Sequence, residues 1–305
     1  MRILVVGAGA TGGYFGGRLA LAGRDVTFLV RGARAETLRK EGLRLMTPEG
    51  EFSLRPQLTL AEDIKQPYDV IILTVKAFAL ESALLDITPA MGQDTLIMPM
   101  LNGMKHLDIL TTRYGKSAVI GGMCKIAATL NSQGHVVRMS PLHELYYGEL
   151  DGSTTQRIQT LDQQLSGAGF DTFLSTSIIN DMWEKWLLLA SLGAITCLMR
   201  GNIGQVASTV GGGQFAHGVI NEVLAIITSA GYRRNEQYIA QTTALLTRTD
   251  SVQTSSMYRD LMQGYPVEAE QVLGDLVTIG HRVGLGSPLL NAAYTHLAVY
   301  QASRT

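Results

Sequence analysis

Residues that hold metals, form disulfides or bind nucleic acids are scarce in this chain of 305 residues. Its two cysteines, Cys124 and Cys197, stand far apart and form no C-x-x-C pair, so we expect neither a disulfide framework nor a zinc knuckle. None of the six histidines belongs to an H-x-x-x-H pair, which leaves a metal site without support. Charged residues make up only 17% of the chain and the formal net charge is −1, so no basic excess indicates nucleic acid.

The chain also lacks an apolar run of the roughly 20 residues that a membrane span needs. Its longest apolar stretch, from Trp186 to Met199, is interrupted by Ser191, Gly193 and Thr196. The apolar N-terminus runs into a glycine-rich turn and offers no cleavage site of the kind that a signal peptide carries. We therefore expect a cytoplasmic protein with reduced thiols and no membrane association.

The most informative pattern lies in the first 31 residues. Ile3–Val6 is a short apolar strand, and Gly7-Ala8-Gly9-Ala10-Thr11-Gly12 is a glycine-rich turn. A helix to about Ala22 and a second strand over 25–31 complete a βαβ unit. In this context a G-x-G-x-x-G turn lets backbone N–H groups approach the pyrophosphate of a dinucleotide at the positive end of a helix. The alternative is an ordinary tight turn between a strand and a helix.

The end of the second strand indicates which dinucleotide binds. An acidic side chain there would accept hydrogen bonds from the ribose of NAD, whereas an arginine suits a 2′-phosphate. The chain has no Asp or Glu between Val26 and Arg34, and it places Arg31 and Arg34 at this point. A guanidinium can bind phosphate through two parallel hydrogen bonds, so we expect NADPH. Arg31 as a merely solvated charge is the alternative.

Further strands and helices alternate as in a doubly wound α/β sheet. A hydrophobic content of 46% supports a large core, and the length suits two domains. After about residue 178 only helical periodicity continues, with breaks at glycine-rich turns. We expect a Rossmann-type domain over 1–175 and an all-helical domain over 176–305. The strands that we expect after residue 31 cover 68–75, 95–100, 118–122, 135–138, 145–149 and 171–175.

Three polar residues are candidates for chemistry. Lys76 and Asn102 each follow a strand, and ligands of open α/β sheets bind at the carboxyl ends of strands. Lys185 lies among large apolar residues, where desolvation would lower its pKa toward a range useful for proton transfer. Each has a plainer alternative: a solvated loop lysine, a turn-forming Asn-Gly pair, and a lysine whose stem packs on the surface.

Several blocks, in this order and spacing, resemble one family over nearly the whole chain. They are Gly7–Gly12 with Arg31, Thr74-Val75-Lys76-Ala77, Leu101-Asn102-Gly103-Met104, Gly148-Glu149-Leu150-Asp151-Gly152, Trp183-Glu184-Lys185, Ser255-Ser256-Met257-Tyr258-Arg259-Asp260 and Gly264-Tyr265-Pro266-Val267-Glu268. The sequence resembles the ketopantoate reductases (2-dehydropantoate 2-reductases) of the 6-phosphogluconate-dehydrogenase-like superfamily. The resemblance implies NADPH-dependent reduction of 2-dehydropantoate to pantoate, a step of pantothenate biosynthesis.

The resemblance also implies roles for single residues. Lys185 matches the lysine that acts as general acid and stabilises the developing alkoxide, and Glu268 matches a glutamate near that lysine and the nicotinamide ribose. Ser256 matches a serine that binds the substrate. Lys76 and Asn102 match residues around the nicotinamide end, so Asn102 is expected to contact both cofactor and substrate. Ala127 matches a backbone contact to the cofactor, through an alignment that needs a gap.

Departures from the family pattern fall in the substrate site. Ketopantoate reductases carry asparagines four and eight residues after the catalytic lysine, on one helix face, where this chain has Leu189 and Gly193. A further asparagine is absent near 272–274. A site that hydrogen-bonds a hydroxyl rejects ligands without one by roughly 10⁴ or more, so the loss of these amides changes or relaxes the expected substrate.

Three interpretations therefore stay open. The chain is a ketopantoate reductase whose substrate amides come from elsewhere, a reductase of a different and more apolar 2-oxo acid, or a non-catalytic protein that senses NADP(H). Retention of both Lys185 and Glu268 argues against the sensor, which needs no proton donor. A homodimer is also open, because an apolar helix that faces a partner has the same pattern as one that faces the core.

Overall fold

The computed structural model describes residues 1–304, which form two compact units. One unit comprises Met1–Leu101 and His106–Ile179, and the other comprises Asn102–Lys105 and the chain from Asn180 onward. The sequence placed the boundary at residue 175 and assigned all of 102–105 to the first part. The short segment Asn102–Lys105 thus follows a strand of the first unit in the chain while packing with the second.

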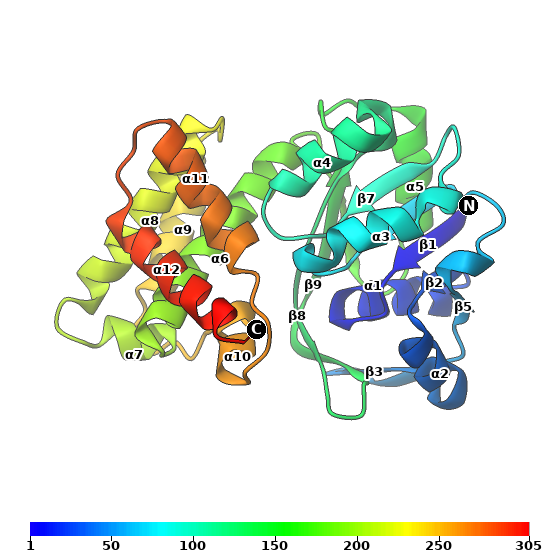
Figure 1. Ribbon diagram of the computed structural model, residues 1–305, viewed down its shortest axis with the longest axis horizontal. Helices are drawn as coiled ribbons and strands as arrows, with labels where there is room; N and C mark the ends of the chain where they lie inside the picture. Colours follow the sequence, from blue (N-terminus) through cyan, green and yellow to red (C-terminus); the bar gives the residue numbers. More distant parts are fainter. Residues whose placement is uncertain (305) are drawn as a thin grey trace. The chain divides into compact units, whose positions relative to one another are not determined.

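The first unit contains strands and helices, and the second unit is helical (Figure 1). The strands are β1 (Arg2–Val6), β2 (Asp25–Leu29), β3 (Leu43–Thr47), β4 (Gly50–Leu54), β5 (Gln57–Thr59), β6 (Val70–Leu73), β7 (Leu96–Pro99), β8 (Gly121–Leu130), β9 (Val136–Gly148) and β10 (Asp171–Leu174). The helices are α1 (Ala10–Leu21), α2 (Gly32–Glu41), α3 (Leu80–Asp86), α4 (Lys105–Tyr114), α5 (Gln156–Leu165), α6 (Ile178–Met199), α7 (Ile203–Ala207), α8 (Gly212–Ser229), α9 (Glu236–Leu246), α10 (Ser256–Met262), α11 (Asp275–Arg282) and α12 (Pro288–Ala302). Short 3₁₀ turns cover Ala61–Asp63, Ala77–Ala79, Thr88–Ala90 and Lys116–Ala118, and Glu270–Gly274 is a π-helical turn.

A parallel sheet of five strands in the order β5-β2-β1-β6-β7 forms the centre of the first unit. All four residues of β6 are buried, and the apolar run of β1 is at most 3% exposed over Ile3–Val6. Strands that read as continuous apolar runs are typical of parallel sheets covered on both faces. The strand order reverses between β1 and β6, and in this fold class ligands bind at such a switch point.

A second sheet differs from the sequence-based expectation. Its order is β10-β9-β3-β4, and β8 pairs antiparallel with β9. The two strands expected over 135–138 and 145–149 are one strand, β9. The pairs Ile126–His143 and Ala128–Arg138 leave residues 139–142 opposite Ala127 alone, so β9 bulges there. Ser140 and Pro141 inside this bulge gave it the composition of a turn.

The expected strand over 118–122 is also wrong in part. Val119 makes only an isolated bridge with Ile97 of the parallel sheet, and β8 begins at Gly121 and runs into the second sheet. The sequence did not predict β3, β4 or β5, which are short and mostly half-exposed. Propensity is a weak guide for such strands, because pairing with neighbours stabilises them.

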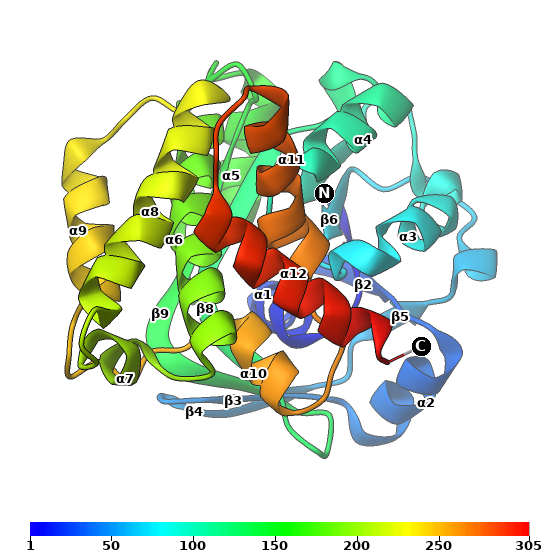
Figure 2. The same ribbon diagram turned by 60° about the vertical axis from the view of Figure 1, so that its left-hand side comes forward.

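The second unit contains helices from α6 to α12. Figure 2 shows α8, α11 and α12 packed side by side. Among the described residues, α6 is the one helix that meets the length and composition of a membrane span, with 22 residues where the sequence suggested a shorter apolar stretch. However, 67% of its most apolar window is buried inside the protein, as in a core helix.

Candidate functional site

The glycine-rich turn of the first unit is shaped by contacts that exclude side chains. Gly7 has a φ of +96°, which favours glycine, and its N–H donates to the carbonyl of Leu29 at 3.0 Å. A Cβ on Gly12 would lie 2.2 Å from both the carbonyl oxygen of Gly7 and Oγ1 of Thr74. The helix α1 therefore starts in direct contact with the turn, as the dinucleotide fingerprint requires.

The N-terminus of α1 is open to a phosphate. Gly9 occupies the N-cap position without a side-chain hydrogen bond, and no acidic residue lies in the first turn of α1. The N–H groups of a first helical turn lack partners within the helix and carry the positive end of its dipole. Ala8, Ala10 and Thr11 complete this turn, so the residues present fit the pyrophosphate of a dinucleotide.

Thr74, just after β6, ties the turn to the neighbouring strand. Its Oγ1 donates toward the carbonyl oxygens of Val6 at 2.8 Å and Gly7 at 3.1 Å. In the sequence, Thr74 stands out only as part of the block Thr74-Val75-Lys76-Ala77. Its signal was its position one residue after a buried strand, where a hydroxyl can bind free carbonyls. Lys76, two residues further on, is exposed at the carboxyl end of β6.

The two arginines after β2 differ in their surroundings. The guanidinium of Arg34 donates to the carbonyl of Ala8 at 3.0 Å and to that of Gly134 at 3.0 Å, and burial lowers its pKa. Arg34 thus fixes the glycine-rich turn. Arg31 is exposed at the N-cap of α2, and its Nη2 donates to Oγ of Ser82 at 3.0 Å. Of the two, Arg31 presents its charge to solvent, where a phosphate could reach it.

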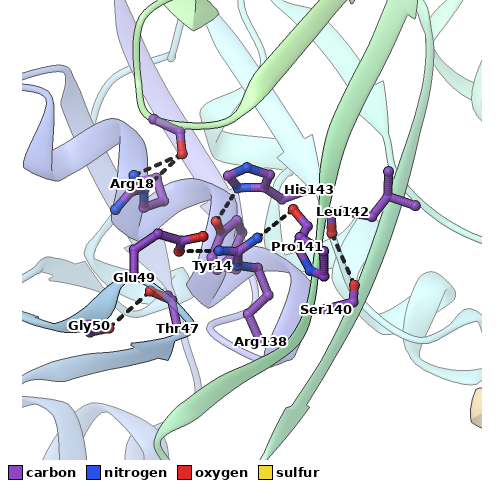
Figure 3. A network of polar contacts seen from close by, with 11 residues as sticks. Tyr14, Arg18, Thr47, Glu49, Gly50, Arg138, Ser140, Pro141, Leu142 and His143 are labelled. Carbon is purple, nitrogen blue, oxygen red and sulfur yellow. Dashed lines mark hydrogen bonds and ion pairs between the residues drawn. The ribbon is translucent and has the colours of Figure 1, made fainter.

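Ala127 lies in β8 at the bulge and is partly buried. A network of polar contacts with α1 and with the turn after β3 holds the bulge of β9 in place (Figure 3). Tyr14 of α1 shares a hydrogen bond of 2.6 Å with Nδ1 of His143. The fully buried guanidinium of Arg138 pairs with Glu49 and donates to the carbonyl of Pro141 at 2.6 Å. The network connects α1, the turn after β3 and the bulge of β9.

A pocket lies within the second unit and brings together three of the predicted site residues, Asn102, Ser256 and Glu268. About 320 Å³ of space free of atoms lies in it, part of which is open to solvent. The residues that line it are Asn102, Leu189, Ser255, Ser256, Met257, Asp260, Glu268 and Val272. They come from four parts of the chain, so the pocket is a product of folding.

Asn102 reaches the pocket because residues 102–105 are held on the π-helical turn. Gly103 has a φ of +79°, and a Cβ there would lie 2.6 Å from the carbonyl oxygen of Gln271. Nδ2 of Asn102 donates to Oε2 of Glu268 over 3.4 Å, and Nζ of Lys105 pairs with Oδ1 of Asp275 at 3.2 Å. Glycine at 103 is therefore needed for the close approach, and the Asn-Gly pair is more than a turn.

Lys185, Leu189 and Gly193 follow one another at intervals of four residues along α6, so they share a face. Leu189 lines the pocket, and the partly buried Lys185 lies one helical turn before it. Lys185 is not itself among the lining residues. Trp186, next to it, is buried and donates from Nε1 to the carbonyl of Val272 at 2.9 Å, which fixes the π-helical turn against α6. Such turns occur frequently at functional sites.

The two adjacent serines have different roles. Oγ of Ser255 accepts from the N–H of Tyr258 at 2.9 Å as the N-cap of α10 and shares a hydrogen bond of 3.0 Å with Thr196. Ser256 is the exposed first residue of α10 and is the serine available to a ligand. Met257 and Asp260 also line the pocket, although the sequence did not predict it. Their spacing from Ser256, one and four residues along a helix, was the available signal.

Other reactive groups do not add a site in the described residues. Burial raises the pKa of the Cys197 thiol to about 12, so it is no nucleophile. In residues 1–304 no three His, Cys, Asp or Glu side chains gather in a way that could hold a metal ion. The candidate chemistry is therefore that of the pocket residues, of Lys185 and of the glycine-rich turn.

Known proteins agree with this arrangement. The family model of ketopantoate reductase PanE/ApbA matches residues 3–152, and the model of ketopantoate reductase PanE/ApbA C terminal matches residues 177–301. The uncharacterized oxidoreductase YkpB of Bacillus subtilis (strain 168) is 34% identical over 304 residues, which are 100% of each chain. The 2-dehydropantoate 2-reductase of Archaeoglobus fulgidus is 28% identical over 284 residues, covering 93% of this chain and 92% of its own.

A solved structure of D-mandelate dehydrogenase with NADH and anilino(oxo)acetate has the same fold. It matches with a TM-score of 0.89 at 21% identity and covers 99% of each chain. The expected fold, a Rossmann-type sheet followed by a helical domain, is confirmed. Because both family models match in order and a full-length relative exceeds 30% identity, the chain belongs to the ketopantoate reductase PanE/ApbA family.

Proposed function

We propose that this protein reduces a 2-oxo acid to the 2-hydroxy acid with NADPH. The observation that carries the proposal is the pocket in which Asn102, Ser256 and Glu268 meet. An amide, a hydroxyl and a carboxylate from three distant positions converge on this one pocket. Convergent polar groups of this kind are the usual mark of a site that orients a small substrate.

The first unit offers the groups that would hold the cofactor. The N–H groups of the glycine-rich turn and the start of α1 would bind the pyrophosphate, and Arg31 would bind the 2′-phosphate. Lys76 and the backbone near Ala127 are further candidates for cofactor contacts. When bound, NADPH would supply a hydride to the carbonyl carbon of the substrate and leave as NADP⁺.

The chain itself would supply the proton. Lys185 would donate it from Nζ to the former carbonyl oxygen and stabilise the negative charge that develops there. Glu268 accepts a hydrogen bond from Asn102, which limits the orientations open to both side chains. The amide of Asn102 and the hydroxyl of Ser256 would then hold the substrate carboxylate and carbonyl in position for transfer.

Two substrates are supported by different observations. The family and the curated relatives named 2-dehydropantoate 2-reductase support 2-dehydropantoate, reduced to pantoate. Leu189 and Gly193, in place of the asparagines of the family, favour a more apolar 2-oxo acid. A non-catalytic sensor of NADP(H) would keep the glycine-rich turn and Arg31 without requiring Lys185.

Loss of NADPH absorbance in the presence of 2-oxo acids tests the proposal. The purified protein is mixed with NADPH and, separately, with 2-dehydropantoate and a panel of branched and aromatic 2-oxo acids. Turnover with at least one acid, giving the 2-hydroxy acid by chromatography, supports the reductase. Tight NADPH binding without turnover of any acid would leave the sensor as the function.

A further inference from the structure

The lining of the pocket is divided by chemistry. Asn102, Ser256 and Glu268 are polar, whereas Leu189, Met257 and Val272 are apolar. Met257 and Val272 are each 5% exposed, so their side chains are fixed by packing rather than free in solvent. Leu189 and Gly193 of α6 stand where the resemblance to ketopantoate reductases implies asparagines.

Gly193 and Met257 occupy one space. A Cβ on Gly193 would lie 2.8 Å from Cε of Met257 and 4.0 Å from Cγ1 of Val272. Real Cβ atoms do not approach another carbon so closely, so any side chain at 193 would have to displace the methyl group of Met257. With no side chain at 193, the methyl group of Met257 lies directly against α6 beside the pocket.

We propose that Met257, seated against Gly193 and beside Leu189, makes the pocket select 2-oxo acids whose carbon 3 bears only apolar groups. The inference rests on the proposed reductase function and names its substrate class. A methyl group gains by contact with these three side chains because it leaves water. A hydroxyl group in the same place loses its hydrogen bonds to water and finds no partner on Leu189, Met257 or Val272.

Two of the polar groups nearby already have hydrogen-bond partners. Oγ of Ser255 already accepts from the N–H of Tyr258 and bonds with Thr196. Glu268 is hydrogen-bonded to Asn102. The carboxylate of Asp260 lines the same pocket and is the group that could receive a substrate hydroxyl if the proposal fails.

Two acids that differ by one hydroxyl group give a direct test. These are 3,3-dimethyl-2-oxobutanoate and its 4-hydroxy derivative, which is 2-dehydropantoate. We expect kcat/KM to be about 10- to 100-fold higher for the acid without the hydroxyl, the range by which an apolar pocket rejects a nearly isosteric hydroxylated ligand. An equal or higher kcat/KM for 2-dehydropantoate would overturn the proposal.

Variants test the residues. Gly193→Asn combined with Met257→Ala restores an amide and provides room for it, and we expect this variant to shift the ratio toward 2-dehydropantoate by at least about tenfold. Gly193→Leu combined with Met257→Ala is the matched control, because leucine is close to asparagine in size and carries no amide. Leu189→Asn, on the partly buried face of α6, adds an amide without touching the glycine and is expected to shift the ratio in the same direction.

A ratio that stays unchanged in the variants carrying an asparagine contradicts the assignment to this wall, even if the wild type prefers the apolar acid. Failure of the underlying function gives a different result. In that case the wild-type protein oxidises NADPH with neither acid and with no other 2-oxo acid of the panel. Turnover of both acids without preference would refute only the selectivity.

Discussion

The ammonium group of Lys105 lies 3.2 Å from Oδ1 of Asp275 and fastens residues 102–105 to the helical unit. The side chain of Asp275 is 9% exposed, and burial raises its pKa while Lys105 opposes this rise. Its second oxygen, Oδ2, is buried and has no hydrogen-bond partner among the described residues. The lysine therefore compensates a carboxylate that the fold solvates poorly.

Replacement of Lys105 by Met should lower the free energy of unfolding by about 1–2 kcal/mol at about pH 7, because it leaves this carboxylate without a cation. The pKa of Asp275 in the folded state lies above its ordinary value of 3.8, so the carboxyl becomes protonated as the pH falls. The loss should shrink in that acidic range, since a neutral carboxyl needs no cation. Urea unfolding of wild type and variant over a pH series measures it. A loss that is constant with pH, or that persists when Asp275→Asn is added, contradicts this role.

The glycine-rich turn can be tested at two of its glycines. Gly12→Ala places a methyl group 2.2 Å from the carbonyl oxygen of Gly7 and from Thr74, so we expect lower stability and weaker NADPH binding. Gly9→Ala is the control, because a Cβ there meets nothing within 4 Å. It should leave the melting temperature nearly unchanged and lower only the affinity for NADPH, because its methyl group lies where the pyrophosphate would approach. Equal thermal shifts for both variants would argue against the steric account.

Arg31 and Arg34 give a second matched pair. Arg31→Ala should lower the affinity for NADPH and leave the affinity for NADH nearly unchanged, because only NADPH carries the 2′-phosphate. Arg34→Ala removes the hydrogen bonds to the carbonyls of Ala8 and Gly134. It should therefore lower the affinity for both nucleotides and the stability of the protein. Fluorescence titration with each nucleotide gives the two affinities. If Arg31→Ala weakens NADH as much as NADPH, the 2′-phosphate contact is wrong.

The sequence predicts an element best where the signals for that element lie within one short stretch of the chain. The strand–turn–helix around Gly7–Gly12 could be predicted because glycine spacing and apolar runs are local signals. The β9 strand could not, since its bulge over 139–142 contains Ser140 and Pro141 and is stabilised by β8 and by the buried Arg138. Pairing with strands distant in the sequence stabilises β9, and the periodicity of its own residues does not predict this pairing.

The candidate site shows the same limit. Asn102, Ser256 and Glu268 were predicted singly, from strand ends and from resemblance, and the structure places them in one pocket. The contact between Gly193 and Met257 was beyond prediction, because it joins two helices 64 positions apart in the chain. What the sequence showed was the missing asparagine; what fills its place depends on packing.

Two substitutions of Lys185, the proposed proton donor, test separately whether its positive charge or its ability to give up a proton is needed. Lys185→Ala should lower kcat by at least about 10², the usual scale of general acid catalysis, with little change in NADPH affinity. Lys185→Arg keeps the positive charge but gives up its proton far less readily. If the lysine donates the proton, the arginine variant should remain slow. Recovery of near-normal kcat by arginine would instead assign Lys185 a purely electrostatic role.

The network behind α1 predicts a pH dependence of stability. Burial, followed by the charge of Arg138, lowers the pKa of His143 below its ordinary value of 6.5. The folded state therefore favours the neutral ring, which shares a hydrogen bond with Tyr14. The stability that this preference contributes is fully present above the pKa that His143 has in the unfolded chain. It is lost as the pH falls through the lower pKa of His143 in the folded protein.

His143→Gln removes the titration while keeping a polar side chain at the bulge. Between about pH 7 and pH 5 the wild-type free energy of unfolding should therefore fall more steeply than that of the variant. Tyr14→Phe is the companion variant, since it removes the hydroxyl partner and leaves the imidazole to titrate. Chemical denaturation over this pH range distinguishes the two. Parallel curves for wild type and His143→Gln would contradict a contribution of His143 to the pH dependence of stability.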